Sequence, residues 1–360
     1  MLDTGYEHLY FIQYPESLQS SLDHPMISKL LVISKLALIF FSLLIFFPSC
    51  GPAENESDVV RLAYLQSDLH HLPAFVALHK GFFEQEGLKV EVSGIFKAGP
   101  ELMSGFAAGS LDAGYVGLSP ATVAVANKTA EVKVIAQVNK NGSALVVRKD
   151  TINKDLSTLK GKVIAIPGHS TIQDFLLRKA LLDSGLNGNL TTIITIKPPE
   201  MITTLSSNNI DAFIAWEPYP SMAINRGFGE IMIYSKDIWK DHPCCVLVVS
   251  NEFLMKYPSK VNLLFNAHLK SINYIKNNLD DAVNIGVKYT GMDKKTIELA
   301  LENIQFDHQM SISKAIDYVQ FLNKLGYTSI TDPQSFVQSL ILNTPLSLDG
   351  RGPAPLNDVM

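Results

Sequence analysis

The sequence has few of the features that mark several common protein classes. Its 360 residues include only three cysteines, which is too few for a disulfide framework. It has no block of Lys or Arg, and 30 basic against 35 acidic residues give a formal net charge of -5. Because a phosphate backbone needs a strongly basic surface, nucleic acid is not an expected partner. The absence of a "GxSxG" elbow argues against a serine hydrolase.

One long hydrophobic run is present, and it lies near the amino end. Residues 36–47 read "LALIFFSLLIFF", with lysines before them and "PSCG" after them. This order predicts a signal peptide, because a spanning helix needs roughly 20 apolar residues. Cys50 follows the small Ser49 as in the lipobox of bacterial lipoproteins, where the cysteine carries the lipid. A plain secreted chain and an uncleaved anchor remain as alternatives.

The sequence upstream of this run does not fit a signal peptide. Residues 1–25 hold four acids and no Lys or Arg, so we interpret them as an extension before a true start at Met26. The polar "GPAENES" after Cys50 reads as a flexible tether. The predicted divisions are an extension at 1–25, a signal peptide with lipobox at 26–50, a tether at 51–57, lobe 1 at 58–148 plus 246–345, lobe 2 at 149–245 and a tail at 346–360.

Strand and helix patterns alternate after the tether. "VVRLAYLQ" (59–66) reads as a buried strand, and "LPAFVALHKGFFEQEG" (72–87) reads as a helix that ends at Gly87. A second run of the same kind starts near Leu159. The sequence therefore predicts an α/β fold with largely parallel sheets in two lobes.

Two further patterns bear on how the lobes are built. "FAAGSLDAGYVGLSP" and "LSSNNIDAFIAWEPY" share a helix, a polar turn and a short strand, and their Asp112 and Asp211 are expected to cap or brace the turns. The Val-rich strands at 143–149 and 244–253 are expected to run side by side as a two-strand hinge. The helical patterns that follow are expected to pack back on lobe 1.

Three segments carry a resemblance to a known family. They are "YLQSDLHHLPAFVALHKGFFEQEGLKVEV", "GSLDAGYVGLSP" and "DAFIAWEPY". In this order, and over about 58–340, the chain resembles the substrate-binding proteins of ABC importers for nitrate, sulfonates and taurine, a family shared with binders of thiamine pyrimidine precursors.

The resemblance implies a bilobed periplasmic-binding-protein fold of type II that holds a solute in its cleft. It also implies a permease and an ATPase subunit of an ABC importer as partners. The location would be the periplasm or the outer face of the cell membrane, with the lipid on Cys50 as the anchor. We expect a monomer.

Loops at the ends of strands are where such a cleft should form. In "GLSP" (117–120), Ser119 and the helix N-terminus are expected to hold an oxyanion, or to form an ordinary N-cap. Ser170 and Gln173 have capping-box spacing at the start of a long helix. The candidate ligand-binding residues are Gln66, Ser67, His70, His71, Gly117, Leu118, Ser119, Asn139, Asn141, His169, Ser170, Thr171, Trp216, Glu217 and Cys244.

Several of these candidates have structural alternatives. Trp216 is either a flat wall for a ligand or part of lobe packing. Asn139 and Asn141 either reach a ligand from the hinge or serve turn chemistry before Gly142. His169 is a possible donor or an ordinary exposed loop residue.

The adjacent histidines and the vicinal Cys244 and Cys245 raise a metal or redox alternative. Neighbouring side chains on a strand point to opposite faces, so the two cysteines should not act together. His70 and His71 should likewise diverge. We therefore predict two small buried hydrophobes, with Cys244 lining the cleft, and neither a metal site nor a cofactor.

The function expected from the sequence is capture of a small solute, not catalysis. The first choice is an anion of the nitrate, sulfonate or taurine kind. A thiamine pyrimidine precursor or another heterocycle is the alternative, because no Arg or Lys stands among the candidates and Trp216 would suit a flat ring. A sensory module and a pyrimidine-synthase-like enzyme are more remote, since the "CCCFC" signature of that enzyme is absent.

Overall fold

The computed structural model describes residues 59–151, 153–186 and 190–342. The predicted signal peptide, lipobox and tether, with Cys50, lie outside the described residues. Within the described part, no helix is both long and apolar enough to cross a membrane.

The first of two five-stranded sheets has the order β2-β1-β3-β11-β4. Its strands are β1 (Val59–Leu65), β2 (Lys89–Phe96), β3 (Ala113–Gly117), β4 (Val132–Gln137) and β11 (Cys245–Ser250). β1 runs parallel to β2 and β3, and β11 runs antiparallel to β3 and β4. The sheet is therefore mixed, and its one antiparallel strand, β11, comes from a distant part of the chain.

The second sheet has the order β10-β6-β9-β7-β8 and repeats the same plan. Its strands are β6 (Ser143–Arg148), β7 (Val163–Ile166), β8 (Thr192–Thr195), β9 (Ala212–Trp216) and β10 (Gly229–Tyr234). β7 is parallel to β8 and β9, and β6 is antiparallel to β9 and β10. The bilobed α/β fold predicted from the sequence is confirmed.

The predicted tandem repeat is visible in two matching carboxylates. Asp112 accepts a hydrogen bond from the backbone N–H of Arg61 at 2.8 Å, at the start of β1. Asp211 accepts one from the N–H of Val163 at 2.9 Å, at the start of β7. Each carboxylate thus braces the turn before its own strand, as expected.

The two Val-rich strands do not pair with each other, which corrects the sequence-based hinge. β6 lies between β10 and β9 in the second sheet, and β11 lies between β3 and β4 in the first. Each is an interior strand with paired neighbours on both sides, so continuous apolar runs are needed there. The short strand β5 (Asn139–Asn141), which leads into β6, pairs instead with β12 (Ile304–Phe306).

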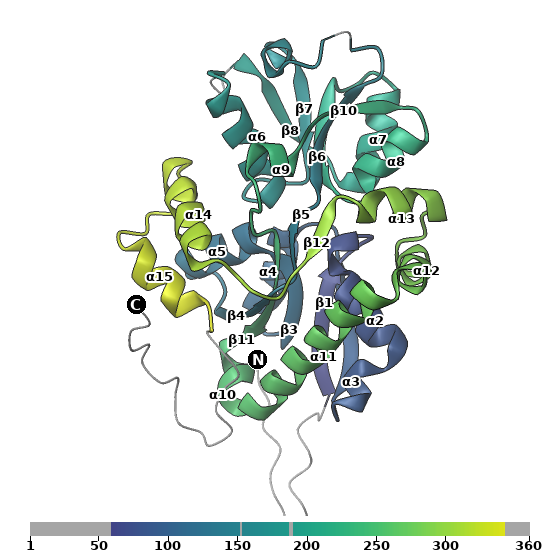
Figure 1. Cartoon of the computed structure of the whole chain (residues 1–360). Helices are drawn as coiled ribbons and strands as arrows, with labels where there is room; N and C mark the ends of the chain where they lie inside the picture. Colours follow the sequence, from purple (N-terminus) through teal and green to yellow (C-terminus); the bar gives the residue numbers. More distant parts are fainter. Residues whose placement is uncertain (1–58, 152, 187–189, 343–360) are drawn as a thin grey trace, which may run out of the picture. The chain divides into compact units, whose positions relative to one another are not determined.

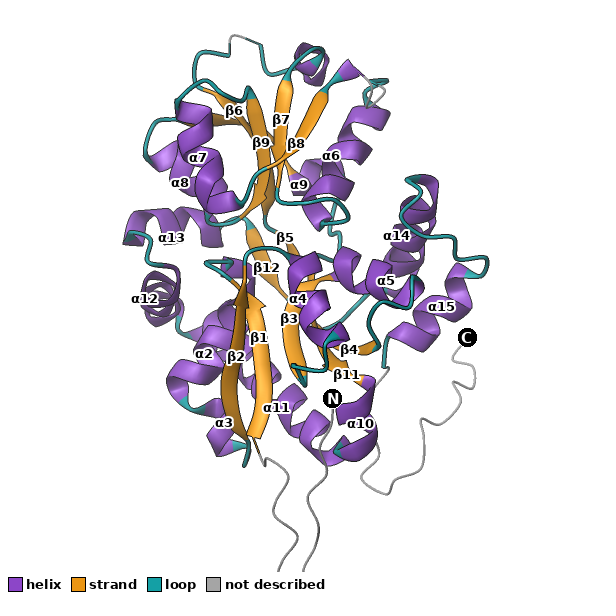
Figure 2. Cartoon of the chain, turned by 180° about the vertical axis from the view of Figure 1, so that it is seen from behind, coloured by secondary structure: helices purple, strands orange, loops and turns teal. Residues whose placement is uncertain are grey.

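The helices cover both faces of the sheets. They are α2 (Leu72–Lys80), α3 (Phe82–Gln85), α4 (Gly99–Ala107), α5 (Leu118–Ala126), α6 (Ile172–Asp183), α7 (Pro198–Ser206), α8 (Tyr219–Asn225), α9 (Ser235–Ile238), α10 (Asn251–Lys256), α11 (Pro258–Asn277), α12 (Leu279–Thr290), α13 (Lys294–Leu301), α14 (Ile312–Lys324) and α15 (Pro333–Leu340), with short 3-10 turns at Leu69–His71 and Leu156–Leu159. In the second lobe, α6 and α9 lie on one face of the sheet and α7 and α8 on the other (Figures 1 and 2).

The carboxyl-terminal helices return to the first lobe, as predicted. The N–H of Leu342, just after α15, donates to the carbonyl of Val134 in β4 at 2.9 Å. α13 also contacts α8 of the second lobe, where Asn225 donates to Asp293 at 3.1 Å. These helices therefore touch both lobes.

Two predicted helix boundaries are corrected. The helix expected at 72–87 is broken at Gly81, whose φ of 65° ends α2 in the left-handed conformation. The N-cap of α6 is Thr171 and not Ser170, because Thr171 Oγ1 accepts from the N–H of Asp174 at 3.3 Å. Ser170 has a φ of 59°, and its N–H donates to Asp174.

Candidate functional site

A small cavity of about 20 Å³ lies where residues of both lobes meet. The lining residues are Leu65, Asp68, Gly99, Gly117, Pro120, Thr171, Ile172, Gln173, Trp216 and Cys245. Leu65, Gly117 and Trp216 end the strands β1, β3 and β9. Ligands of α/β folds bind outside the carboxyl ends of parallel strands, so this is the expected place for a solute.

Two helices from different lobes begin at this cavity. Gly117 is the N-cap of α5, and Thr171 is the N-cap of α6. The two helix starts are so close that a Cβ added to Gly117 would lie 2.9 Å from Cγ1 of Ile172. Since helix N-termini carry partial positive charge and free N–H groups, their convergence favours a negatively charged group between them.

The lining is apolar or glycine except for five side chains, Asp68, Thr171, Gln173, Trp216 and Cys245. The indole N–H of Trp216 is buried and has no hydrogen-bond partner within the described structure. Gln173, also buried, donates from Nε2 to the Ser143 hydroxyl at 2.9 Å, which links α6 to β6. The lining includes no Lys or Arg, so an anion here would depend on N–H groups.

A cluster of buried ionisable groups adjoins the cavity. Asp68 accepts from the N–H of His70 at 3.0 Å, and its carboxylate also lies 3.7 Å from Nε2 of His71. Burial raises the pKa of Asp68 to about 7. Burial also lowers the pKa of His71, whose Nδ1 accepts from the N–H of Leu65 at 3.1 Å.

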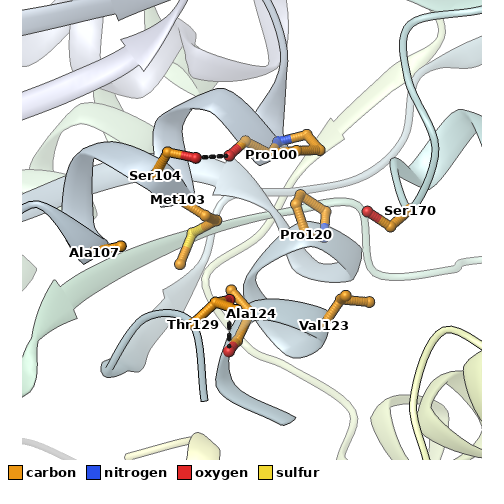
Figure 3. Close-up of a pocket in the computed structure, with 9 residues that line it drawn as sticks. All are labelled: Pro100, Met103, Ser104, Ala107, Pro120, Val123, Ala124, Thr129 and Ser170. Atoms are coloured by element: carbon orange, nitrogen blue, oxygen red, sulfur yellow. Dashed lines mark hydrogen bonds between the residues drawn. The ribbon is translucent and has the colours of Figure 1, made fainter. Parts of the chain in front are cut away.

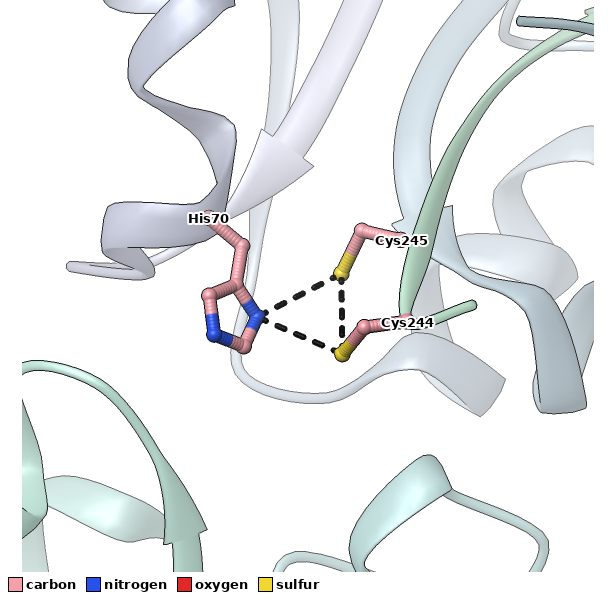
Figure 4. Close-up of side chains that lie close together, drawn as sticks. All are labelled: His70, Cys244 and Cys245. Atoms are coloured by element: carbon pink, nitrogen blue, oxygen red, sulfur yellow. Dashed lines mark hydrogen bonds between the residues drawn. The ribbon is translucent and has the colours of Figure 1, made fainter. Parts of the chain in front are cut away.

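His70 is held against both thiols (Figure 4). Its Nδ1 lies 3.5 Å from Sγ of Cys244 and 3.6 Å from Sγ of Cys245, and the two sulfurs are 4.0 Å apart. This corrects the prediction that the cysteines face opposite ways. The strand alternation does not apply, because β11 begins only at Cys245.

The ionisable groups in this cluster shift the pKa values of one another. Burial would raise the pKa of the Cys244 thiol, but a hydrogen bond from Cys245 and the neighbouring His70 lower it well below its usual value. Burial would lower the pKa of His70, but Cys244 and Asp68 raise it to about 9. The pair therefore favours a thiolate beside an imidazolium.

Asn139 and Asn141 brace the crossover between the sheets. Asn139 Oδ1 accepts from the N–H of Cys245 at 3.2 Å, and its Nδ2 donates to the carbonyl of Asn141 at 3.1 Å. Glu217 is also buried, and burial raises its pKa to about 7 although Ser221 and Asn303 donate to it. None of these three predicted residues lines the cavity.

The structure brings only some of the predicted residues to the cavity. Gly117, Thr171 and Trp216 line it, and His70, His71 and Cys244 lie in the adjoining cluster. The remaining predicted residues of the two loops and of α5 do not line it: Gln66, Ser67, Leu118, Ser119, His169 and Ser170. Cys244, which was expected to line the cleft, does not line this cavity, whereas Cys245 does.

Sequence reasoning missed Asp68 as a site residue and used Gln173 only as a capping residue. Asp68 could have been found from its position between two predicted ligand contacts in "QSDLHH", since it caps the short turn that carries both histidines. No comparable signal was present for the contact of Cys245 with His70.

A larger cavity of about 130 Å³ lies between α4 and α5 (Figure 3). Its walls are largely apolar, and Ser170 of the second lobe stands at one side. The hydroxyls of Ser104 and Thr129 both donate to backbone carbonyls at 3.1 Å. Few polar groups are left for a solute, so we place the candidate site at the smaller cavity.

Comparison with known proteins agrees with this architecture. Residues 53–285 match the family model described as NMT1-like. A putative aliphatic sulfonates-binding protein of Bacillus subtilis is 28% identical over 278 residues, which cover 74% of this chain and 82% of that protein.

Two solved structures are similar in fold. The periplasmic nitrate-binding protein NrtA from Synechocystis PCC 6803 has a TM-score of 0.71 at 17% identity, covering 79% of this chain and 86% of that one. The alkanesulfonate-binding protein SsuA from Xanthomonas axonopodis pv. citri, bound to MOPS, has a TM-score of 0.70 at 17% identity and covers 80% and 99%.

Proposed function

Because the chain belongs to the NMT1-like family and has the periplasmic-binding-protein fold, we propose that it is the solute-binding protein of an ABC importer. It captures a small anion of the nitrate or sulfonate kind between its lobes and delivers it to a permease and ATPase. The observation that carries the proposal is the meeting of the α5 and α6 N-termini at one inter-lobe cavity. The similar sulfonate- and nitrate-binding proteins support it.

Binding and closure are one process in this proposal. A cavity of about 20 Å³ has room for one water, so a sulfonate requires the lobes to part. The solute then bridges the start of α5 in one lobe and the start of α6 in the other. The closed form is selected in proportion to these added contacts.

The location and anchoring belong to the same proposal. The protein works on the outer side of the cytoplasmic membrane as a monomer, held there by a lipid on Cys50. Cys50→Ser is expected to release the protein from the membrane fraction. Continued retention of that variant would instead indicate a spanning anchor.

The solute class can be tested on the full-length protein in mild detergent. Native mass spectrometry is run with a panel of sulfonates, nitrate, bicarbonate and pyrimidines. A retained sulfonate or nitrate is the expected result. The proposal is contradicted if the panel gives no adduct and no change in the emission of Trp216, measured in a Trp239→Phe background that leaves one tryptophan.

A flat heterocycle is the second candidate, and the observation in its favour is Trp216. A buried indole with an unpartnered N–H offers both a ring face and a donor. Retention of a pyrimidine and of no anion in the same panel would favour this candidate.

Gln173 provides a specific test of where the solute sits. Gln173→Ala is expected to weaken binding of the retained solute about tenfold, because it removes a buried donor at the cavity. Gln334→Ala, at an exposed position of α15, is the matched control. Isothermal titration calorimetry measures both, and equal affinities would remove Gln173 from the site.

A further inference from the structure

The His70, Cys244 and Cys245 cluster has the geometry of a metal site. The three potential ligand atoms are Nδ1 of His70 and the two Sγ atoms, separated by 3.5, 3.6 and 4.0 Å. Tetrahedral zinc with Zn–S of about 2.3 Å and Zn–N of about 2.05 Å would separate its ligands by ~3.6 Å for N to S and ~3.8 Å for S to S. The observed spacing lies within a few tenths of an ångström of these values.

The hydrogen bond that His70 makes through Nε2 leaves its other ring nitrogen, Nδ1, for a metal ion. Nε2 lies 2.7 Å from the carbonyl oxygen of Gly142, which can only accept, so Nε2 carries a proton. Nδ1 faces the two sulfurs, so it is the nitrogen that can coordinate once an incoming metal ion displaces its proton. A ligating histidine commonly donates its other N–H to a backbone carbonyl, which fixes the tautomer and the ring orientation.

His71 is less suited than His70 to coordinate a metal ion. Its Nδ1 accepts from the N–H of Leu65, so the neutral ring carries its proton on Nε2, toward the carboxylate of Asp68. Asp68 is occupied on its other side by the N–H of His70. These two residues are therefore neighbours of the site and not its first choice of ligands.

From this geometry we propose that His70, Cys244 and Cys245 bind a thiophilic d¹⁰ cation, Zn²⁺ or Cu⁺, in a three-ligand site of the first lobe, beside the inter-lobe cavity. A donor set of two sulfurs and one imidazole selects such ions over Mg²⁺ and Ca²⁺, which prefer oxygen. All three ligands are buried. Cys245 also lines the inter-lobe cavity, so the proposed site borders the space that a solute would enter.

The site is held by elements that are distant in sequence. His70 lies in the turn after β1, and the cysteines lie at the start of β11, 174 residues further on. The N–H of Cys245 is fixed by Asn139, and the carbonyl of Cys244 accepts from the N–H of Leu118 at 2.8 Å. The ligands are therefore positioned before a metal arrives, which favours affinity.

The test uses the full-length protein, reduced with a phosphine, stripped of metal with a chelator and titrated anaerobically with Co²⁺ and then Zn²⁺. One equivalent of Co²⁺ should give an intense thiolate-to-cobalt charge-transfer band that Zn²⁺ displaces. X-ray absorption of the zinc form should show sulfur at about 2.3 Å and nitrogen at about 2.0 Å.

Variants assign the ligands. Cys244→Ser and Cys245→Ser should each lose the charge-transfer band and bind Zn²⁺ about 100-fold more weakly or worse, and His70→Gln should bind similarly weakly. Cys50→Ser, which changes the one other cysteine of the sequence, and His79→Gln, at an exposed position, are the matched controls and should bind as the unaltered protein does.

The proposal is overturned if the unaltered protein binds Co²⁺ without the charge-transfer band, or if the Cys244→Ser/Cys245→Ser double variant retains zinc with equal affinity. Spectra of the unaltered protein decide the matter even if a variant fails to fold. No solute is present in these titrations, so their failure leaves the proposed solute binding untouched.

Discussion

His268 lies fully buried in α11 against the first sheet. Its Nε2 donates to the carbonyl of Gln137 at 2.9 Å, and its Nδ1 lies 3.2 Å from the hydroxyl of Tyr115. The neutral imidazole is thus satisfied, whereas a protonated ring would be a buried charge. Burial lowers the pKa of His268 from 6.5 to about 4.

This depressed pKa makes stability depend on pH. Below pH 6.5 the unfolded chain takes up the proton first, so the contribution of His268 is complete above pH 6.5 and is lost as the pH falls toward 4. The loss is up to roughly 3 kcal/mol of unfolding free energy for this residue. Chemical denaturation at a series of pH values measures it.

His268→Gln should remove this part of the pH dependence. The variant should be less stable than the unaltered protein at pH 7, and the difference should narrow as the pH falls to 4.5. His79→Gln, which changes an exposed ring, should leave the curve unchanged. A parallel displacement of the His268→Gln curve over the whole range would show that the residue contributes packing alone.

At the residue scale, local sequence patterns predicted the place of a side chain better than they predicted which distant residue it contacts. Asp112 and Asp211 were predicted to brace turns because each stands in the same polar turn before a short strand, but their partners Arg61 and Val163, 51 and 48 residues away, were not predicted. The contact of His70 with two cysteines depends on strand pairing between residues 174 positions apart. No local pattern encodes that distance, so the sequence suggested diverging side chains instead.

At the scale of elements, α5 and α6 meet through Gly117. Its φ of -64° suits any residue, so the backbone does not require glycine there. The available space does require glycine, because a Cβ added at position 117 would lie 2.9 Å from Ile172 in the other lobe and 3.2 Å from Pro120. Gly117→Ala should therefore obstruct closure more than it disturbs either lobe.

We expect Gly117→Ala to weaken solute affinity about tenfold. Without solute, its melting temperature should stay within a few degrees of that of the unaltered protein. Gly168→Ala is the matched control, since an added Cβ there would make only an ordinary contact of 3.7 Å with Thr171. Calorimetry and thermal unfolding measure the two effects. Equal affinities for both variants would mean that the helix starts do not meet in the bound form.

The alternation of strands and helices was predictable because each element has its own hydrophobic period and its own caps. The partners of β6 and β11 were not, because a continuous Val-rich run fits the interior of any sheet. The prediction placed both at one hinge, whereas β6 stays in a sheet of consecutive strands and only β11 crosses into the sheet formed by residues 59–137. The confirmed family resemblance carries the two-lobe fold but does not specify which solute the cavity accepts.

At the scale of the whole described unit, an ion pair links the two lobes. Lys197, at the start of α7, pairs with Glu101 of α4. Both side chains are partly exposed, at 28% and 43%, so the pair contributes up to about 1 kcal/mol. Because the pair joins the lobes near the candidate site, it should stabilise the closed form and not the fold of either lobe.

Glu101→Gln removes this link while keeping the shape of the side chain. We expect the solute dissociation constant to rise up to about fivefold, since 1 kcal/mol of closure energy is lost. Hydrogen–deuterium exchange at the starts of α5 and α6 should quicken without solute. High salt should produce a similar effect in the unaltered protein, because it screens exposed charges.

A pair within one lobe provides the control. Lys179 and Asp183 are both in α6, 2.8 Å apart and of similar exposure, so Asp183→Asn removes an ion pair without affecting closure. If Glu101→Gln and Asp183→Asn change affinity and exchange equally, the inter-lobe pair does not govern closure. If only Glu101→Gln acts, part of the closure energy resides at the edge of the cleft, apart from the contacts that the solute itself makes.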